Sequence, residues 1–318
     1  MGLSRGPEVV SSVLLQPIDH QVIAAHGGDF LKSMPQTECV VLTRGSWDPP
    51  IMDWPMQRSG LGACGLPVVD GVNLPKPLLE ALGQETPYMD VPLIVWNNDQ
   101  EIGTFFAEHG RHSDILGMTS RVFRDYLVKH FDGLKPDWGP KVAALYSDEI
   151  EREPMLAYDQ IGSDLGVSCG NIEVAKHAGK SFSSPVYSVV MTAALSGRPG
   201  GFLSKAYHGL DLELATQSSD KQALARRDVW TAWYVRDIWQ SFAEHGDLRR
   251  HRWVEVVQPS DVQDSLCNGT SGGPTLLPTY HVMEVANGRP AIPRKNMKRR
   301  QCSFWRSQSF GAEFWWSN

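Results

Sequence analysis

The sequence of 318 residues has few of the features that mark a metal-binding, nucleic-acid-binding or membrane protein. Its five cysteines have no C-x-x-C spacing, which argues against a zinc ribbon or a thioredoxin-like site. No apolar run approaches the roughly 18 residues of a membrane span, and the first residues lack the apolar core of a signal peptide. The formal net charge is −6, which gives no overall basic field for nucleic acid. We therefore predict no cofactor, no metal, no nucleic-acid partner and no membrane span.

Two local patterns could suggest otherwise, and neither is specific. The basic run Arg294–Arg300 has no stacking aromatic residues between its charges, so we interpret it as a solvated segment. His109 and His112 stand beside Glu108, but Gly110 disfavours a helix there and no third ligand is evident, so we expect a surface loop.

What the sequence does contain is an alternation of apolar strands and helical segments. Val91–Trp96 and Pro185–Met191 are short runs typical of buried strands. Residues 119–180 have helical spacing of apolar residues, with one helix expected over Asn171–Ala178 and ending at Gly179. A second aromatic-rich helix is expected over 228–244, before Gly246. Trp253–Val257 alternates in part and suggests a further strand. This order predicts an α/β fold with a mostly parallel sheet.

Polar residues that could do chemistry follow both strands. The cluster Asn97–Glu101 comes directly after the first strand, and His208 lies beyond the second. Because parallel strands end at the same edge of a sheet, a carboxylate and an imidazole could meet there. A histidine can act as a general base toward a hydroxyl nucleophile when a carboxylate fixes its tautomer. The order acid then His matches the second part of the Ser…Asp/Glu…His order of α/β-hydrolases.

Five short motifs, in order, resemble those of the type-B carboxylesterase and cholinesterase-like family. They are Pro67–Gly71, Val91–Leu93 followed by Glu101, His208–Leu212, Phe242–Asp247 and Cys302–Trp305. The resemblance implies an α/β-hydrolase fold, present as the C-terminal part of its mostly parallel sheet with flanking helices. It implies Glu101 as the triad acid, His208 as the base and a disulfide between Cys169 and Cys302.

The sequence departs from the family pattern around the acid. Trp96 and Ile102 occupy positions where the family has glycine, and Gly103 comes one place late. Asp99 therefore stays as an alternative acid.

The nucleophile is the largest departure, because no G-x-S-x-G elbow in a strand–turn–helix setting is recognised upstream of Glu101. The match at Gly269–Gly273 comes after the histidine, follows no apolar strand and leads to Pro274, so we expect a loop. We therefore expect the chain to supply base and acid without a nucleophile, and to be inactive by itself. Its partner would be a small-molecule ester if an upstream half completes the site.

A non-catalytic cholinesterase-like binding or adhesion module is the alternative function. We place the carboxylesterase-like domain at residues 31–310, after a poorly defined segment 1–30 and before a tail 311–318. The family disulfide would indicate the secretory route, although no signal peptide is recognised. On that route Asn268, in Asn-Gly-Thr, would be a glycosylation acceptor.

Overall fold

The computed structural model describes residues 72, 75–76, 78–82, 90–101, 117–196, 205–216, 225–257 and 279–307. All of them belong to one of two compact units, the one made of Pro49–Arg58 and Leu66–Asn318. The segments 1–30 and 311–318 lie outside the described residues, and the boundaries expected for the domain remain a prediction.

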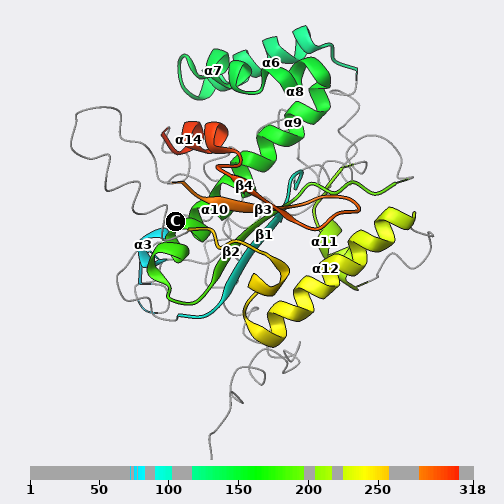
Figure 1. Cartoon of the computed structure of the whole chain (residues 1–318). Helices are drawn as coiled ribbons and strands as arrows, with labels where there is room; N and C mark the ends of the chain where they lie inside the picture. The colour runs from blue at the N-terminus through cyan, green and yellow to red at the C-terminus, as the bar shows by residue number, and fades with distance from the viewer. Residues whose placement is uncertain are drawn as a thin grey trace, which may run out of the picture. The chain divides into compact units, whose positions relative to one another are not determined.

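A four-stranded, mostly parallel sheet is the centre of this mixed α/β structure (Figure 1). The strands are β1 (Leu93–Asn98), β2 (Val186–Met191), β3 (His281–Val285) and β4 (Ile292–Lys295), and they lie side by side in that order. β1 pairs in parallel with β2, and β2 with β3, whereas β4 runs antiparallel to β3. The three parallel strands therefore end at one common edge, as the α/β prediction requires.

Helices form both crossovers. Between β1 and β2 lie α6 (Ser120–Leu134), α7 (Trp138–Leu145), α8 (Ser147–Arg152), α9 (Pro154–Ser163), the π-helical turn η3 (Asp164–Ser168) and α10 (Cys169–Ser181). Between β2 and β3 lie α11 (Leu210–Thr216), α12 (Arg226–His245) and the short 3₁₀ turn η5 (Arg249–His251). The short α3 (Leu78–Leu82) precedes β1, and α14 (Arg299–Ser307) follows β4.

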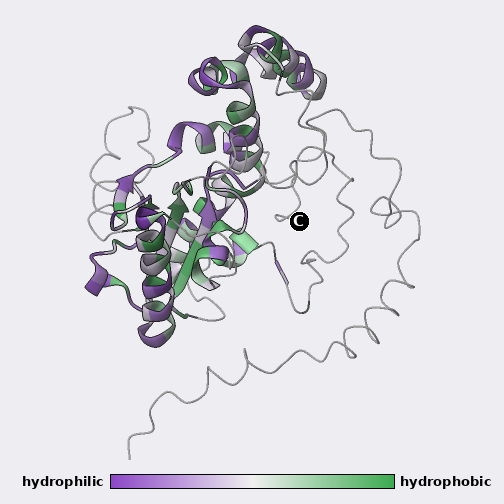
Figure 2. Cartoon of the chain, turned by 90° about the vertical axis from the view of Figure 1, so that its right-hand side faces the viewer, coloured by the Kyte–Doolittle hydropathy of each residue, from purple (hydrophilic) through white to green (hydrophobic). Residues whose placement is uncertain are grey.

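The side chains of β2 divide the interior into two cores. All six residues of this strand are buried. Val186 and Val190 pack with residues of α6 to α10 and α14, whereas Tyr187, Val189 and Met191 pack with residues of α11 and α12. This alternation follows from the two-residue period of a strand. The sheet is thus covered by helices on both faces, and Figure 2 shows the hydrophobic strands between helices of mixed hydropathy.

The long helix α12 follows its sequence pattern closely. Gly246 ends it in the left-handed conformation, with φ of 65°, as the prediction required. Tyr234 and Ile238 are buried against the sheet, and Trp230, Trp239 and Phe242 pack beside them. The expectation of one continuous core face is wrong only for Trp233, which is 54% exposed.

Two predicted elements differ from the structure. Trp253–Val257 forms no strand, because Val256 alone bridges the sheet: its N–H donates to Val186 and its carbonyl accepts from His281. The helix expected to stop at Gly179 continues to Ser181. A side chain at Gly179 would meet the Val256 side chain at 2.5 Å, so close packing rather than helix termination accounts for this glycine.

The basic run Arg294–Arg300 is solvated only in part, since Arg294, Lys295 and Arg300 are exposed but Lys298 is not. It spans the end of β4, a turn and the start of α14. Within it, the Lys298 side chain is only 8% exposed and reaches two carboxylates. A lysine paired in this way can be buried, which the charge pattern alone did not indicate.

Candidate active site

The turn Asp99–Glu101 and the segment before His208 are joined by their backbones. Beyond the end of β1, Gln100 forms an isolated parallel bridge with Tyr207, and the Gln100 N–H donates to the Ala206 carbonyl at 3.0 Å. The bridge pairs the chain just beyond β1 with residues 206 and 207, which lie on a separate segment after β2. It brings the next residue on each segment, Glu101 and His208, to the same edge of the sheet.

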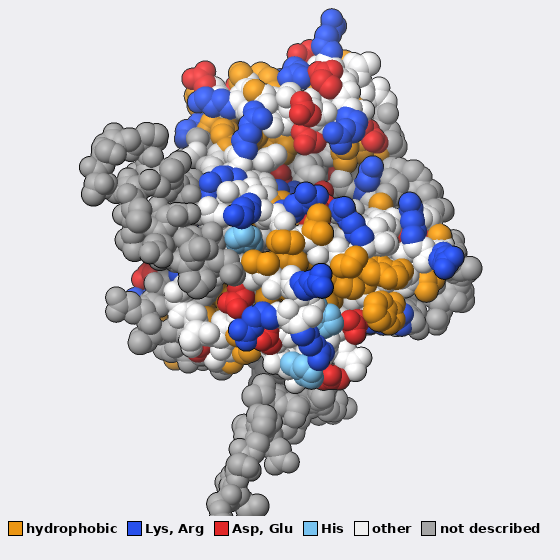
Figure 3. Space-filling model, in the orientation of Figure 1, with side chains coloured by type: hydrophobic (Ala, Val, Ile, Leu, Met, Phe, Trp, Pro, Cys, Tyr) orange, Lys and Arg blue, Asp and Glu red, His pale blue; other side chains and the backbone are white. Residues whose placement is uncertain are grey.

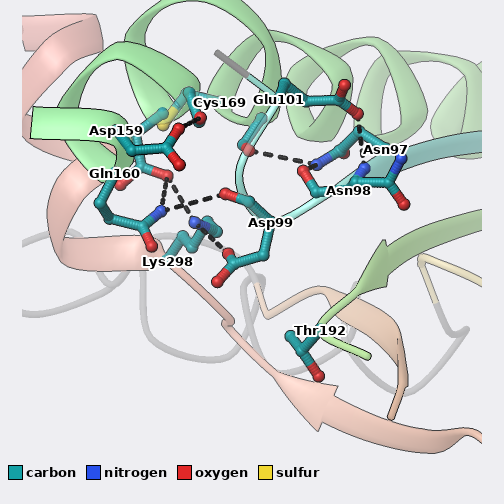
Figure 4. A network of polar contacts seen from close by, with 12 residues as sticks. Asn97, Asn98, Asp99, Glu101, Asp159, Gln160, Cys169, Thr192 and Lys298 are labelled. Atoms are coloured by element: carbon teal, nitrogen blue, oxygen red, sulfur yellow. Dashed lines mark hydrogen bonds and ion pairs between the residues drawn. The ribbon is translucent and has the colours of Figure 1, made fainter. Parts of the chain in front are cut away.

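The imidazole of His208 and the carboxylate of Glu101 are in direct contact. His208 Nδ1 lies 2.6 Å from Glu101 Oε2. The other carboxylate oxygen, Oε1, accepts the Asn98 N–H at 2.6 Å (Figure 4). An ionised carboxylate only accepts hydrogen bonds, so the contact favours the tautomer with the proton on Nδ1 and with Nε2 as the basic nitrogen.

Burial differs sharply across this pair. The Glu101 side chain is 7% exposed, whereas the His208 side chain is 56% exposed. The carboxylate is therefore fixed in the protein while the imidazole faces solvent. This is the arrangement that a base needs if it is to meet a substrate from outside.

Helix α11 begins two residues after His208 and contacts the residues around it. Gly209 has φ of 80°, a conformation that suits glycine, and it lets the chain turn into α11 directly after the histidine. Asp211 in the first turn of α11 accepts from Asn98 Nδ2 at 2.8 Å. Tyr207 also contacts Glu213 through its hydroxyl. The start of α11 is thus bonded both to the end of β1 and to the residue that precedes the histidine.

Asp99, the alternative acid, contacts a different partner. Its Oδ1 lies 2.7 Å from Lys298 Nζ, which also lies 2.5 Å from Asp164 Oδ1. Asp99 and Glu101 leave the turn toward different neighbours, as Figure 4 shows. The structure therefore brings Glu101, and not Asp99, to His208.

The buried cluster around Lys298 contains two carboxylates and one ammonium. Burial raises the pKa of the Asp164 carboxyl, while the Lys298 charge acts against that shift. Burial alone would lower the pKa of Lys298, but the Asp164 and Asp99 charges together outweigh it and raise that pKa. Tyr146 donates its hydroxyl to Asp164 at 3.1 Å, and burial raises the pKa of this phenol. Lys298 therefore remains charged at any pH near neutral.

A disulfide joins Cys169 and Cys302, which confirms the predicted pairing. Cys169 begins α10 directly after the π-helical turn, and Cys302 lies in α14. The bond thus fastens α14 to the crossover helix α10.

A second set of triad-type residues lies on α12 and η5. His251 Nε2 is 3.0 Å from Ser241 Oγ, and His251 Nδ1 is 3.6 Å from Asp237 Oδ2. Ser241 is only 3% exposed, however, and its Oγ also accepts from Arg250 Nη2 at 2.6 Å. A nucleophile must be reached by substrate, so we interpret this set as packing at the end of α12.

Several sequence-based predictions lie outside the described residues. These are the motif Pro67–Gly71, the positions Ile102 and Gly103, the His109–His112 pair, the acceptor Asn268 and the Gly269–Gly273 loop.

One candidate nucleophile was missed at the level of sequence. Gly2-Leu3-Ser4-Arg5-Gly6 also fits G-x-S-x-G, and it stands upstream of Glu101. The five-residue pattern itself was the signal that could have found Ser4, and it gives the chain order Ser…Glu…His. Ser4 lies outside the described residues as well.

Within the described part of the chain, no three His, Cys, Asp or Glu side chains are grouped so that they could hold a metal ion. None of the helices described is long and apolar enough to cross a lipid bilayer. No protein-family model matches the chain, and no curated protein matches it.

Proposed function

We propose that this chain carries the base and the acid of a Ser-His-Glu triad in a carboxylic-ester hydrolase. The observation that carries the proposal is the 2.6 Å contact between His208 Nδ1 and Glu101 Oε2 at the edge where the parallel strands end. Two sequence motifs that resemble those of type-B carboxylesterases supply these residues. The parallel sheet with helices on both faces is compatible with a truncated α/β-hydrolase fold.

In the proposed reaction a serine hydroxyl attacks the ester carbonyl carbon while His208 Nε2 takes the hydroxyl proton. Glu101 keeps the imidazole in the required tautomer and stabilises the imidazolium that forms. The tetrahedral intermediate then collapses, and His208 returns the proton to the departing alcohol. Water hydrolyses the acyl-enzyme by the same two steps, again with His208 as base and then acid.

The serine is proposed to come from a segment outside these 318 residues. An elbow serine needs a strand before it and a helix after it to present Oγ at the sheet edge. None of the four described strands leads into a G-x-S-x-G turn, and β1 pairs with β2 alone among them. The chain by itself is therefore proposed to be inactive on small esters. The disulfide supports a secreted or secretory-pathway protein.

The proposal that the nucleophilic serine lies outside this chain can be tested directly. The purified chain is incubated with p-nitrophenyl acetate and with a fluorophosphonate probe, and labelled peptides are then mapped. We expect no turnover above the rate of a His208→Ala variant and no labelled serine. Labelling of Ser4 that disappears in His208→Ala would show instead that the chain contains its own nucleophile, while keeping the assigned base.

The roles of His208 and Glu101 are tested in a longer product that includes the transcript sequence upstream of Met1. A G-x-S-x-G elbow there is expected, and turnover should fall about 10³–10⁴-fold in His208→Ala and in Glu101→Gln. A different residue at the serine position, or turnover unaffected by His208→Ala, would contradict the hydrolase.

A non-catalytic binding module is the second candidate, and one surface feature favours it. Val229 and Trp233 on α12 and Leu212 on α11 are about half exposed. Figure 3 shows hydrophobic side chains gathered over α12 with lysine and arginine side chains around them. Exposed apolar groups of this kind often mark contact surfaces. The transcript test above separates the two candidates.

A further inference from the structure

We propose that Lys298 and Asp99 are positioning residues for the His208–Glu101 pair, a role that rests on the function proposed above and deepens it. The Lys298 ammonium fixes the Asp99 side chain. The turn Asp99–Glu101 then keeps the Glu101 carboxylate against the His208 imidazole.

Lys298 is the first residue of this connection, and its backbone has an unfavourable conformation. Its φ is 57°, in the left-handed region that non-glycine residues seldom adopt. Strain of this kind persists where the surrounding structure holds the residue in place. The Cys302 N–H donates to the Lys298 carbonyl at 2.9 Å, and Cys302 carries the disulfide to Cys169. The lysine is thus fixed at its backbone and aimed at the carboxylates.

The far side of the cluster is equally fixed. Asp164 lies in the π-helical turn and is 1% exposed. It accepts from Tyr146 at 3.1 Å and from Gln160 Nε2 at 3.0 Å, and Trp305 Nε1 donates to the Tyr146 oxygen at 2.9 Å. Lys298 therefore stands between a buried, multiply bonded carboxylate and the more accessible Asp99. π-Helical turns inside α-helices are frequent at functional sites.

From Asp99 the connection to the active-site pair is two residues long. The Asp99 N–H donates to the Met191 carbonyl at 2.9 Å, and the Asp99 carbonyl accepts from Gln160 at 3.4 Å. Asn98, on one side, donates its N–H to Glu101 Oε1. Gln100, on the other side, is bridged to Tyr207. If the ion pair between Asp99 and Lys298 is lost, the turn that holds the Glu101 carboxylate loses one of its attachments.

The deciding variant is Asp99→Asn, because it leaves the Lys298–Asp164 pair intact. The readout is the pH midpoint of His208, measured as the rate of diethyl pyrocarbonate modification of the His208 peptide from pH 5 to 8.5. Only the neutral imidazole reacts, and a fixed Glu101 carboxylate raises the midpoint. We expect Asp99→Asn to lower this midpoint by about 0.5 pH unit or more.

A double-mutant cycle separates positioning from direct charge. Asp99→Asn also removes a negative charge two residues from Glu101, and any direct effect of that charge on His208 does not depend on Glu101. In a Glu101→Gln background we therefore expect the shift to shrink to less than about 0.2 unit. An undiminished shift in that background, or no shift in Asp99→Asn alone, would overturn the proposal.

This experiment needs no substrate and no serine, so it does not depend on the hydrolase proposal. Failure of the longer product to hydrolyse esters would leave the coupling between Asp99 and His208 measurable. Loss of the coupling would leave the assignment of His208 and Glu101 as base and acid in place. Circular dichroism of Asp99→Asn should match that of the unsubstituted chain, which excludes unfolding as the cause of a shift.

Discussion

Glu101 and Asp99 are carboxylates of the same turn, but the side chains that they contact differ in exposure. Both side chains are largely covered, with 7% and 23% exposed. The partner of Glu101 is the His208 imidazole, which is 56% exposed, whereas the partner of Asp99 is the Lys298 ammonium, which is 8% exposed. An exposed histidine can exchange protons near neutral pH. A buried lysine with a raised pKa keeps its charge. The same turn therefore carries two different pairs. Glu101 with His208 is suited to proton transfer, whereas Asp99 with Lys298 is suited to a permanently charged ion pair.

The buried residues around Lys298, including the disulfide, should contribute more to the free energy of unfolding than the Glu101–His208 pair. Replacing Cys169 and Cys302 together by alanine opens a loop with a sequence separation of 133 residues. In the chain-entropy model this costs about 4–5 kcal/mol of the free energy of unfolding. Urea unfolding followed by circular dichroism measures the loss. Reductant should destabilise the unsubstituted chain to the same extent and leave the double variant unchanged. A loss below about 1 kcal/mol would show that other contacts hold α14 in place.

Lys298→Met should have the next largest effect, because it leaves Asp164 buried without its counter-charge. Removing one partner of a buried ion pair typically costs about 3–5 kcal/mol. The matched control is Lys295→Met, since Lys295 belongs to the same basic run and is exposed. It should change the free energy of unfolding by about 0.5 kcal/mol or less. Equal effects from the two substitutions would contradict the distinction between a buried anchor and a solvated charge.

Glu101→Gln should have the smallest effect on stability, although it lies two residues from Asp99. Its partner is more than half exposed and the glutamine oxygen can still accept from Asn98, so the expected loss is about 1 kcal/mol or less. The same urea titration measures it. A loss as large as that of Lys298→Met would mean that Glu101 serves the fold rather than a proton-transfer site.

The central strands and the contact between Glu101 and His208 were predictable because their signals are local. Parallel strands covered on both faces read as continuous apolar runs, which is how β1 and β2 were found. The acid and histidine were found from short motifs at the ends of those strands. The long helix α12 was found because its aromatic spacing and its terminal glycine agree.

The elements after residue 279 could not be predicted in the same way. β3 includes His281 and Glu284, which break its apolar run, and β4 has exposed Pro293 and Arg294. Lys298 reads as one charge among several, and its partner Asp164 is 134 residues away in sequence. Burial of a charge depends on such distant partners, which composition and spacing do not show.

The π-helical turn η3 gives the crossover a feature that a uniform α-helix would lack. α9, η3 and α10 follow one another without a break from Pro154 to Ser181. Because an α-helix advances about 100° per residue, the deletion of one residue within η3 would rotate α9 by about that angle about its own axis relative to α10. Gln160 would then face away from the Asp99 carbonyl. The number of residues in this helical segment is therefore constrained. Insertions or deletions should be tolerated in loops before they are tolerated here.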